Sequence, residues 1–396
     1  MQPAPPLPTT PPLATPSGKP RARAFVASLL GRPGRYNAIT DVPGLTVGYT
    51  TLIEGEGKLR VGRGPVRTGV TAILPRGRDG VGMPCAAGWF SLNGNGEMTG
   101  TAWLEETGSL DLPILLTNTH AVGSCHRATI DWVNQHHPDL TRAWLLPVVA
   151  ETWDGYLNDI NGAHVQSAHA LNAIESAKGG VIEEGSVGGG TGMNCYAFKG
   201  GSGTASRLVE YGAQTYTVAA FVQANFGGRQ ELTVTGCHIG PLLADDNPME
   251  DEFIANWPGA GSCIAVIATD APLLPGQCKA LARRVPMGLA RTGTTGSHFS
   301  GDLFLAFSTA NRGALASRFP VGAPDPEKLD RLDFIPWGRI DPFYQAVAHA
   351  VEEAVLNALI ANETMIGRDS HRSPALPRER LAALLRRSGQ IMPGAS

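Results

Sequence analysis

The segment from residue 179 to residue 203 carries ten glycines among its 25 residues. Glycine weakens a helix interior and lets one stretch of backbone approach another closely, so this segment predicts turns and tight contacts. Its spacing matches neither a dinucleotide-binding loop nor a Walker A loop with its lysine. We therefore interpret the glycines as backbone that fits closely around other parts of the fold.

Composition excludes several classes of protein. Glycine makes up 49 of the 396 residues without a three-residue period, which excludes collagen. The formal net charge of −3 predicts no basic surface for nucleic acid. No apolar run is long enough to cross a membrane and no secretory signal is visible, so we expect a cytoplasmic protein, with a periplasmic location left open. The six cysteines form no C-x-x-C pair, and no zinc motif occurs, so no metal and no cofactor are expected.

Short apolar runs alternate with helical patterns along most of the chain. We predict strands at Val70–Leu74, Ile114–Thr117, Trp144–Val149, Tyr216–Gln223, Ser262–Ala268 and Leu303–Ser308, and helices at Gly123–Gln135, Gly162–Ala177, Leu274–Gly288 and from Asp341 to about Ile360. In the last helix, Asp341 is the expected N-cap and Pro342 the expected first helical residue. The mixture predicts an α/β layered fold with helices covering a sheet core.

The two ends of the chain differ from the middle. Residues 1–35 open with a proline-rich stretch and predict a disordered tail. Residues 371–396 form a basic tail with an amphipathic patch at Arg380–Arg387. We interpret this patch as a solvated terminal helix, and a contact within an oligomer is the alternative.

A second informative stretch runs from residue 244 to residue 270. Its first part is acidic and predicts a surface loop, and at Gly261–Ser262 it changes into an apolar β-run. If the bond between these two residues is cut, Ser262 becomes a new N-terminus with a nucleophilic hydroxyl. Its α-amine, with an ordinary pKa of about 7.7–8.0, is then a general base near neutral pH. On these residues alone, a serine that starts an ordinary strand is the alternative.

Longer motifs recur in order along the chain. They are ITDVPGLTVG (39–48), VRTGVTAILP (66–75), LNGNGEMTG (92–100), LTNTHAVG (116–123), DGYLNDI (154–160), GGGTGM (188–193), FKGGSGTASR (198–207), VQANFG (222–227), GSCIAVIATDAPL (261–273), GLARTG (288–293) and SGDLFLAFSTAN (300–311). In these motifs the chain resembles the family of self-processing serine aminopeptidases that includes the L-aminopeptidase/D-esterase and the β-peptidyl aminopeptidases. The resemblance covers roughly residues 38–365.

The resemblance implies a fold and a maturation step. The fold would be an αββα sandwich like that of the N-terminal-nucleophile hydrolases, with its own strand connectivity. Cleavage between Gly261 and Ser262 would give a larger chain (36–261) and a smaller chain (262–370) of one domain. These processed heterodimers would assemble into a homo-tetramer.

The implied activity is release of N-terminal β-amino or small α-amino residues from peptides, amides and esters through an acyl-enzyme on Ser262. The substrate would be a small molecule with a free amine. Two alternatives remain at this point. One is an amidohydrolase or acyltransferase of the same fold that acts on non-peptide linear amides. The other is an unprocessed, non-catalytic binding homologue.

The resemblance also implies roles for individual residues. Ser300 and Asp302 of the S-G-D motif would orient the free amine of Ser262, and Asn225 would donate its side-chain amide to the oxyanion. On the residues alone, Asn225 could instead serve a turn, and the S-G-D pair could cap a strand. Cys263 is expected to point to the face opposite Ser262, because side chains alternate along a strand.

Four more residues are candidates for contacts with the substrate. The resemblance places an active-site tyrosine or similar group at Tyr156. Glu151 and Asp154 are carboxylates that could meet the ammonium group of a substrate, although either could be a solvated loop acid. Asn118, near the end of a predicted strand, could line the pocket or serve a turn.

Overall fold

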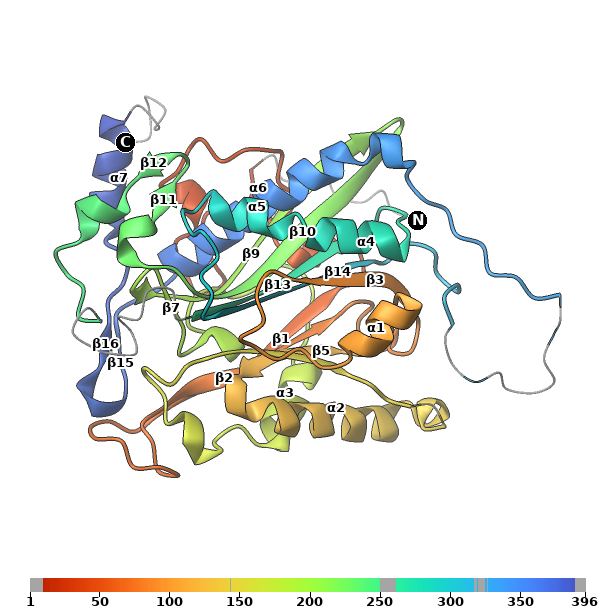
Figure 1. Cartoon of the computed structure of the whole chain (residues 1–396), viewed down its shortest axis with the longest axis horizontal. Coiled ribbons are helices and arrows are strands. Elements are labelled where there is room, and N and C mark those ends of the chain that lie inside the picture. Colours follow the sequence, from red (N-terminus) through yellow and green to blue (C-terminus); the bar gives the residue numbers. More distant parts are fainter. Residues whose placement is uncertain are drawn as a thin grey trace.

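The computed structural model of the chain describes residues 10–142, 144–249, 261–316, 319, 325 and 327–388. Its centre consists of two sheets (Figure 1). The smaller sheet has the order β1 (Thr46–Glu54), β2 (Val66–Leu74), β5 (Ile114–Asn118), β6 (Val148–Thr152). The larger sheet has the order β4 (Ser109–Leu110), β3 (Cys85–Ser91), β14 (Ser300–Ser308), β13 (Gly261–Thr269), β10 (Gln214–Asn225), β9 (Gly201–Tyr211).

Apolar side chains pack between the two sheets, which lie face to face. Phe221 and Ile264 of the larger sheet share one buried cluster with Ile73 and Leu116 of the smaller sheet. Alternate residues of the same strands, such as Cys263 after Ser262, face a second cluster on the outer side of the larger sheet. Each central strand therefore buries both of its faces, which explains its nearly continuous apolar sequence.

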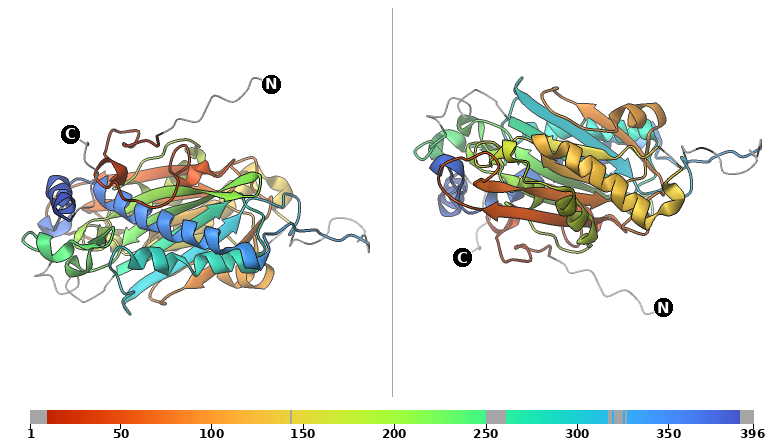
Figure 2. Two further views of the ribbon diagram at one scale, coloured as in Figure 1. Left: turned by 90° about the horizontal axis from the view of Figure 1, so that it is seen from above. Right: turned by 90° about the horizontal axis from the view of Figure 1, so that it is seen from below.

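Helices cover the outer face of each sheet. Three of them, α4 (Pro275–Ala282), α5 (Val285–Ala290) and α6 (Asp341–Ile360), lie on the larger sheet, and α2 (Val122–His136) and α3 (Ser167–Glu175) lie on the smaller one. The views from above and below show the two helix layers separately (Figure 2). A short helix, α1 (Thr101–Thr107), follows β3. The result is the predicted four-layer order of helices, sheet, sheet and helices.

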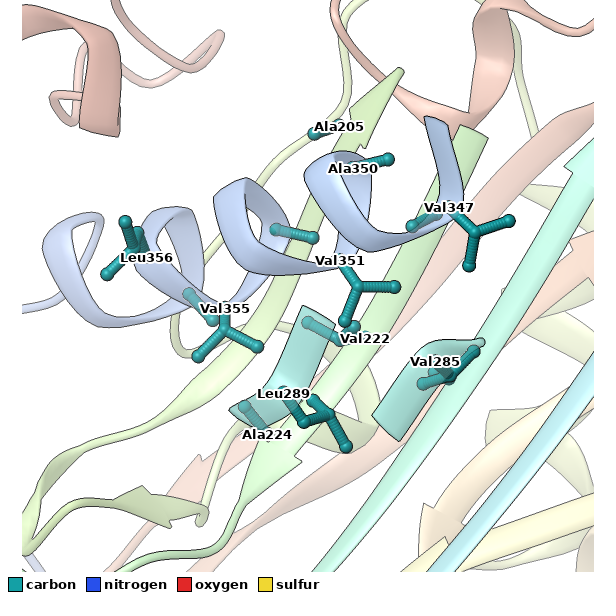
Figure 3. Close-up of a cluster of buried hydrophobic side chains, with 14 of the residues drawn as sticks. Ala205, Val222, Ala224, Val285, Leu289, Val347, Ala350, Val351, Val355 and Leu356 are labelled. Atoms are coloured by element: carbon teal, nitrogen blue, oxygen red, sulfur yellow. The ribbon is translucent and has the colours of Figure 1, made fainter. Parts of the chain in front are cut away.

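Helix α6 lies closest to the larger sheet. Val351 and Val355 of α6 pack with Leu289 of α5 over Val222 of β10 (Figure 3). A Cβ atom on Gly203 of β9 would lie 2.0 Å from a backbone oxygen of α6, so only glycine allows this approach. This contact agrees with the interpretation that the glycine-rich segment is backbone fitted closely to its neighbours.

Several predicted elements have different bounds in the structure. The strand predicted at 144–149 begins only at Val148, because Pro147 cannot donate a ladder hydrogen bond. The helix predicted at 162–177 is confined to α3, since Ala163 adopts a left-handed backbone conformation with φ of 52°. The region 274–288 forms two helices, α4 and α5, and Pro286 near the start of α5 favours a new helix there. Asp341 is the first residue of α6 rather than its N-cap, which is Ile340.

The predicted disordered tail, in its described part from residue 10 onward, packs against the domain. Ala22 and Val26 are buried in the cluster beneath α6. The Nε atom of Arg21 lies 2.6 Å from Oε2 of Glu184, and both side chains are buried. Only the first residues of this segment are rich in proline. The apolar residues that follow them are part of the core of the domain. Residues 1–9 lie outside the described residues.

The basic C-terminal tail also differs from its prediction. Residues Arg378–Arg387 form helix α7, so the expected helix is present. Its apolar side, with Leu381 and Leu385, is fully buried in the core cluster, and so it is not a solvated helix. Residues 389–396 lie outside the described residues. Within the described ranges, no helix is both long enough and apolar enough to cross a membrane.

Candidate active site

Ser262 is the second residue of β13, in the middle of the larger sheet. Across the antiparallel ladder it pairs with Asn225, the last residue of β10, and across the parallel ladder it pairs with Gly301 of β14. Directly paired residues point to the same face of a sheet. The Nδ2 atom of Asn225 accordingly lies 3.2 Å from the Oγ atom of Ser262, and only 2% of Ser262 is exposed.

A second donor reaches the Ser262 hydroxyl from the other sheet. The backbone N–H of Trp153, directly after β6, donates to Oγ of Ser262 over 3.2 Å. The Asn225 amide also donates to the backbone oxygen of Trp153 over 2.9 Å. Two N–H donors therefore converge on one buried hydroxyl. Fixed N–H donors of this kind can stabilise negative charge that develops on an oxygen atom.

The orientation of the Asn225 amide follows from its remaining contact. Its Oδ1 atom accepts a hydrogen bond from the backbone N–H of Asn194 over 2.9 Å. A backbone N–H can only donate, so the oxygen of the amide must face Asn194 and the nitrogen must face Ser262. Asn194 belongs to the glycine-rich segment that the sequence singled out.

The S-G-D motif begins β14 beside the Gly261–Ser262 bond. Ser300 pairs with Gly261 in the parallel ladder, and Asp302 pairs with Cys263. The hydroxyl of Ser300 donates to Oδ1 of Asp302 over 2.6 Å. Burial raises the pKa of Asp302, and hydrogen bonds from Ser300, from Asn93 and from the backbone of Cys263 oppose that rise. The two residues flank the start of β13, and their role towards the amine of Ser262 stays a prediction.

Asn93 holds this motif and was not named by the sequence reasoning. Its Nδ2 atom donates to Oδ2 of Asp302 over 2.9 Å, and its Oδ1 atom accepts the backbone N–H of Asp302 over 2.7 Å. The only signal in the sequence was its place in the motif at residues 92–100. Nothing in that motif indicates that a loop after β3 reaches the start of β14.

Glu151, one of the two predicted carboxylates, lies next to the loop that contains Gly96. Its Oε1 atom accepts the backbone N–H of Glu97 over 2.8 Å, and its Oε2 atom accepts the hydroxyl of Thr119. A Cβ atom on Gly96 would lie 3.2 Å from that Oε1 atom and 3.1 Å from the Cα atom of Gly301. Gly96 is thus wedged between the carboxylate and the residue that pairs with Ser262. Burial raises the pKa of Glu151.

Asp154 occupies the interior instead. Its side chain is fully buried, and its Oδ1 atom accepts the amide of Asn158 over 3.0 Å. Burial raises its pKa to about 7, although hydrogen bonds from Thr68, Asn158 and Asn118 oppose the rise. Neither carboxylate is a solvated loop acid.

Asn118 and Tyr156 have structural contacts away from Ser262. The Oδ1 atom of Asn118 accepts the backbone N–H of His120, and its Nδ2 atom donates to Thr68, so the turn role that was left open for it is present. The phenol of Tyr156 donates to the backbone oxygen of Arg372 over 3.3 Å, and its ring stacks on His371. The group of this segment that touches Ser262 is the backbone of Trp153. The phenol of Tyr156 does not make this contact, and its predicted place in the active site stays a prediction.

The cysteine after the nucleophile lies on the opposite face, as predicted. Cys263 is buried in the cluster under the helices, and burial raises the pKa of its thiol well above the ordinary value. Among the described residues, no group of three or more His, Cys, Asp or Glu side chains could hold a metal ion.

Comparison with known proteins places this geometry in context. The model of peptidase family S58 matches residues 37–373. A β-peptidyl aminopeptidase of Sphingosinicella microcystinivorans is 47% identical over 376 residues, which cover 93% of this chain and 92% of that protein.

Two solved structures are also similar to the chain. One is the L-aminopeptidase D-Ala-esterase/amidase of Ochrobactrum anthropi, described as a prototype for the serine aminopeptidases and a new variant of the Ntn-hydrolase fold. It has a TM-score of 0.86 and 43% identity, and the match covers 94% of this chain and 100% of that one. The other is a β-aminopeptidase of Burkholderia sp., with a TM-score of 0.83, 43% identity and the same coverage. The predicted fold class is confirmed.

Proposed function

Because the chain belongs to peptidase family S58 and is a serine-type aminopeptidase, we propose that it cuts its own Gly261–Ser262 bond and then uses Ser262 as an N-terminal nucleophile. The observation that carries this proposal is the convergence of the Asn225 amide and the Trp153 N–H on the Ser262 hydroxyl. These donors serve both the self-cleavage and the later turnover.

In self-cleavage, the Oγ atom of Ser262 attacks the carbonyl carbon of Gly261. The peptide C–N bond breaks, the nitrogen of Ser262 takes up a proton, and an ester joins Gly261 to Ser262 until water hydrolyses it. The position before the serine must be glycine, because a Cβ atom there would lie 2.5 Å from the backbone oxygen of Asn225. After the cut, the ladder between β13 and β10 keeps the two chains in one sheet.

In turnover, the same hydroxyl attacks the substrate carbonyl, and the free α-amine of Ser262 accepts the proton. The amide of Asn225 and the N–H of Trp153 donate to the oxyanion. The amine then protonates the leaving group, and water releases the acyl group from Ser262. Ser300 and Asp302, on the strand beside the new N-terminus, orient the amine and balance its charge.

The free amine of the substrate binds Glu151 rather than Asp154. Glu151 lies beside Gly96 and Gly301 next to the reacting strand, whereas Asp154 is enclosed among amide and hydroxyl groups. A carboxylate beside the site selects substrates with an N-terminal ammonium group. Together with the similarity to β-peptidyl aminopeptidases, this supports release of β-amino or small α-amino residues from peptides, amides and esters.

The processed heterodimers assemble into a homo-tetramer in this proposal. Apolar side chains on the surface support an assembly, because large exposed apolar groups commonly mark contacts between proteins. Trp144 is 75% exposed and lies with its ring 4.9 Å from that of Phe319, and Leu329 is 82% exposed. The mass in solution tests this point.

Self-cleavage is tested on a denaturing gel. The purified protein should convert from one chain of 41.6 kDa into two, and the smaller should begin with the sequence Ser-Cys-Ile-Ala. Ser262→Ala should remain one chain and stay inactive. Two chains from that variant would show that another residue makes the cut.

A further inference from the structure

We propose that Lys199 is a positioning residue for the oxyanion donor. Its side chain fixes the peptide group between Met193 and Asn194, and that peptide group turns the amide of Asn225 towards Ser262. The inference rests on the proposed roles of Ser262 and Asn225 and assigns a function to a residue far from both in sequence.

Lys199 is a buried cation without a carboxylate partner. It ends the short strand β8 (Phe198–Lys199), which pairs with β7 (Asn194–Cys195), and its side chain is fully buried. Its Nζ atom donates to the backbone oxygen of Met193 over 2.6 Å and to that of Gly200 over 2.9 Å. Among the described residues, no carboxylate lies in ion-pair contact with it. A buried charge without a counter-ion costs stability, so stability does not explain why a lysine is present.

The hydrogen bond from Lys199 to Met193 is connected to the active site through one peptide group. The carbonyl of Met193 and the N–H of Asn194 belong to one planar trans peptide group and point in opposite directions. Lys199 holds the carbonyl end, and the N–H end donates to Oδ1 of Asn225 over 2.9 Å. The other end of that amide donates to Ser262. Lys199 and the backbone N–H of Gly200 therefore both hold the peptide plane that decides which way the amide faces, and Lys199 is the donor that can carry a charge.

The hydrogen bonds from Lys199 through the peptide group to Asn225 also transmit the polarising effect of the lysine charge. Hydrogen bonds in a chain strengthen one another in a low-dielectric interior. A cation on the Met193 carbonyl makes the Asn194 N–H a stronger donor. That donor in turn makes the Nδ2 hydrogens of Asn225 more positive. The effect grows when negative charge develops on the oxyanion, so it favours the transition state over the bound substrate.

The loop does not need the lysine in order to fold. The backbone N–H of Gly200 also donates to the Met193 oxygen over 2.9 Å, and the amide of Asn362 donates to the Gly200 oxygen over 2.8 Å. The backbone N–H of Lys199 itself donates to Pro374 over 2.7 Å. Lys199→Met therefore leaves neither carbonyl without a donor and removes a buried charge. We expect this variant to fold.

Burial, and to a smaller extent the charge of Lys19, lower the pKa of Lys199 to about 7. Asp154 and Cys195 act in the opposite direction. The side chain keeps N–H donors in either protonation state, so the orientation of the peptide group does not depend on its charge. Only the polarisation of the hydrogen bonds depends on the charge of Lys199.

The test compares Lys199→Met, Asn225→Ala, the double variant and Asn362→Ala, each as the cleaved full-length protein. Asn362 is the matched control, because its amide holds the same loop at the backbone oxygens of Lys199 and Gly200 without touching Met193. Steady-state kinetics on a free-amine p-nitroanilide give kcat and KM separately, and thermal unfolding reports the fold. The rate at which the precursor is cut gives the same comparison for any variant that matures slowly. If Lys199→Met does not fold, Lys199→Gln replaces it.

We expect Lys199→Met to lower kcat by about ten-fold with KM within about two-fold, and Asn362→Ala to change kcat by less than about two-fold. In the Asn225→Ala background, Lys199→Met should add almost nothing, because its effect passes through Asn225. An unchanged kcat in Lys199→Met, an equal loss in Asn362→Ala, or a full additive loss in the double variant would each overturn the proposal. A wild-type kcat in Asn225→Ala would instead overturn the proposed function itself.

Discussion

The amide nitrogen of Asn225 lies 3.2 Å from the hydroxyl oxygen of Ser262, because the two residues are direct partners on antiparallel strands β10 and β13. The pairing puts both side chains on the face towards the smaller sheet. There they contact the backbone of Trp153, which directly follows β6. Three strands from two sheets thus build one site at their ends.

Asn225→Ala should lower kcat by roughly a hundred-fold or more, because it removes one of two oxyanion donors. KM should change much less, since the donor acts on charge that develops in the transition state. Steady-state kinetics with a p-nitroanilide check both values. Asn225→Ala with an unchanged kcat would show that Asn225 serves the strand end only.

Gly261→Ala should slow self-cleavage by at least about ten-fold. The added Cβ atom would lie 2.5 Å from the backbone oxygen of Asn225, so the strand must shift away from the site. The measurement is the rate at which the single chain disappears on a denaturing gel. Gly276→Ala is the matched control, because a Cβ atom there meets no atom within 4 Å. Equal rates for the two variants would argue against a tight fit at residue 261.

Glu151→Gln should raise KM for free-amine substrates by about ten- to a hundred-fold, with a smaller effect on kcat, because it removes the charge that meets the ammonium group. Burial raises the pKa of Glu151, so the wild-type KM should also rise as the pH falls and the carboxylate takes up a proton.

Asp154→Asn is the control for this series and should leave KM within about two-fold. Acetylation of the substrate amine should abolish turnover of the wild-type protein. Equal rates on acetylated and free substrates would favour the amidohydrolase alternative and remove Glu151 from amine binding.

Asp154→Asn should change how stability depends on pH. Burial raises the pKa of Asp154 from 3.8 to about 7, so the folded protein holds a proton that the unfolded chain releases between these values. The contribution of Asp154 to stability is therefore greatest below pH 3.8, falls as the pH rises, and is fully lost above about pH 7. The variant has no carboxyl group to ionise at this position, so its stability should fall less than that of the wild-type protein between pH 5 and pH 8. Urea unfolding at pH 5 and pH 8 measures the difference. The same pH dependence in both proteins would contradict the assignment.

Arg21→Ala should lower the free energy of unfolding by about 3–5 kcal/mol, because it leaves Glu184 charged and unpaired in the interior. Arg32→Ala, which breaks an exposed pair with Glu210, should cost less than about 1 kcal/mol. Urea unfolding of both variants compares the two values. A small loss for Arg21→Ala would mean that residues 10–35 contribute little to the fold.

Local patterns in the sequence determined much of this protein. The alternation of apolar runs predicted the central strands, because a strand buried on both faces must be apolar throughout. The change at Gly261–Ser262 marked the start of β13. Strand alternation placed Cys263 on the face opposite Ser262. Each of these properties depends on residues that are close together in the chain.

The bounds of elements were harder to predict where one residue changes the backbone. Pro147, Ala163 and Pro286 shortened or divided predicted elements. The prediction of a disordered N-terminal tail was wrong, because it rested on the prolines and gave no weight to the few apolar residues that complete the core around Ala22. The docking of α7 through Leu381 depends likewise on a surface that no local pattern describes.

Only the tertiary structure decided which groups surround Ser262. The N–H of Trp153 is a backbone donor, and a backbone N–H is the same in almost every residue, so the sequence holds no signal for it. Asn93 and Lys199 contact segments that are distant in sequence and that strand register and loop closure bring together. The sequence therefore specified the strand that carries Ser262 and, through the family resemblance, predicted Ser262 as the nucleophile. The surrounding hydrogen bonds depend on how distant strands align, which is settled only when the two sheets pack.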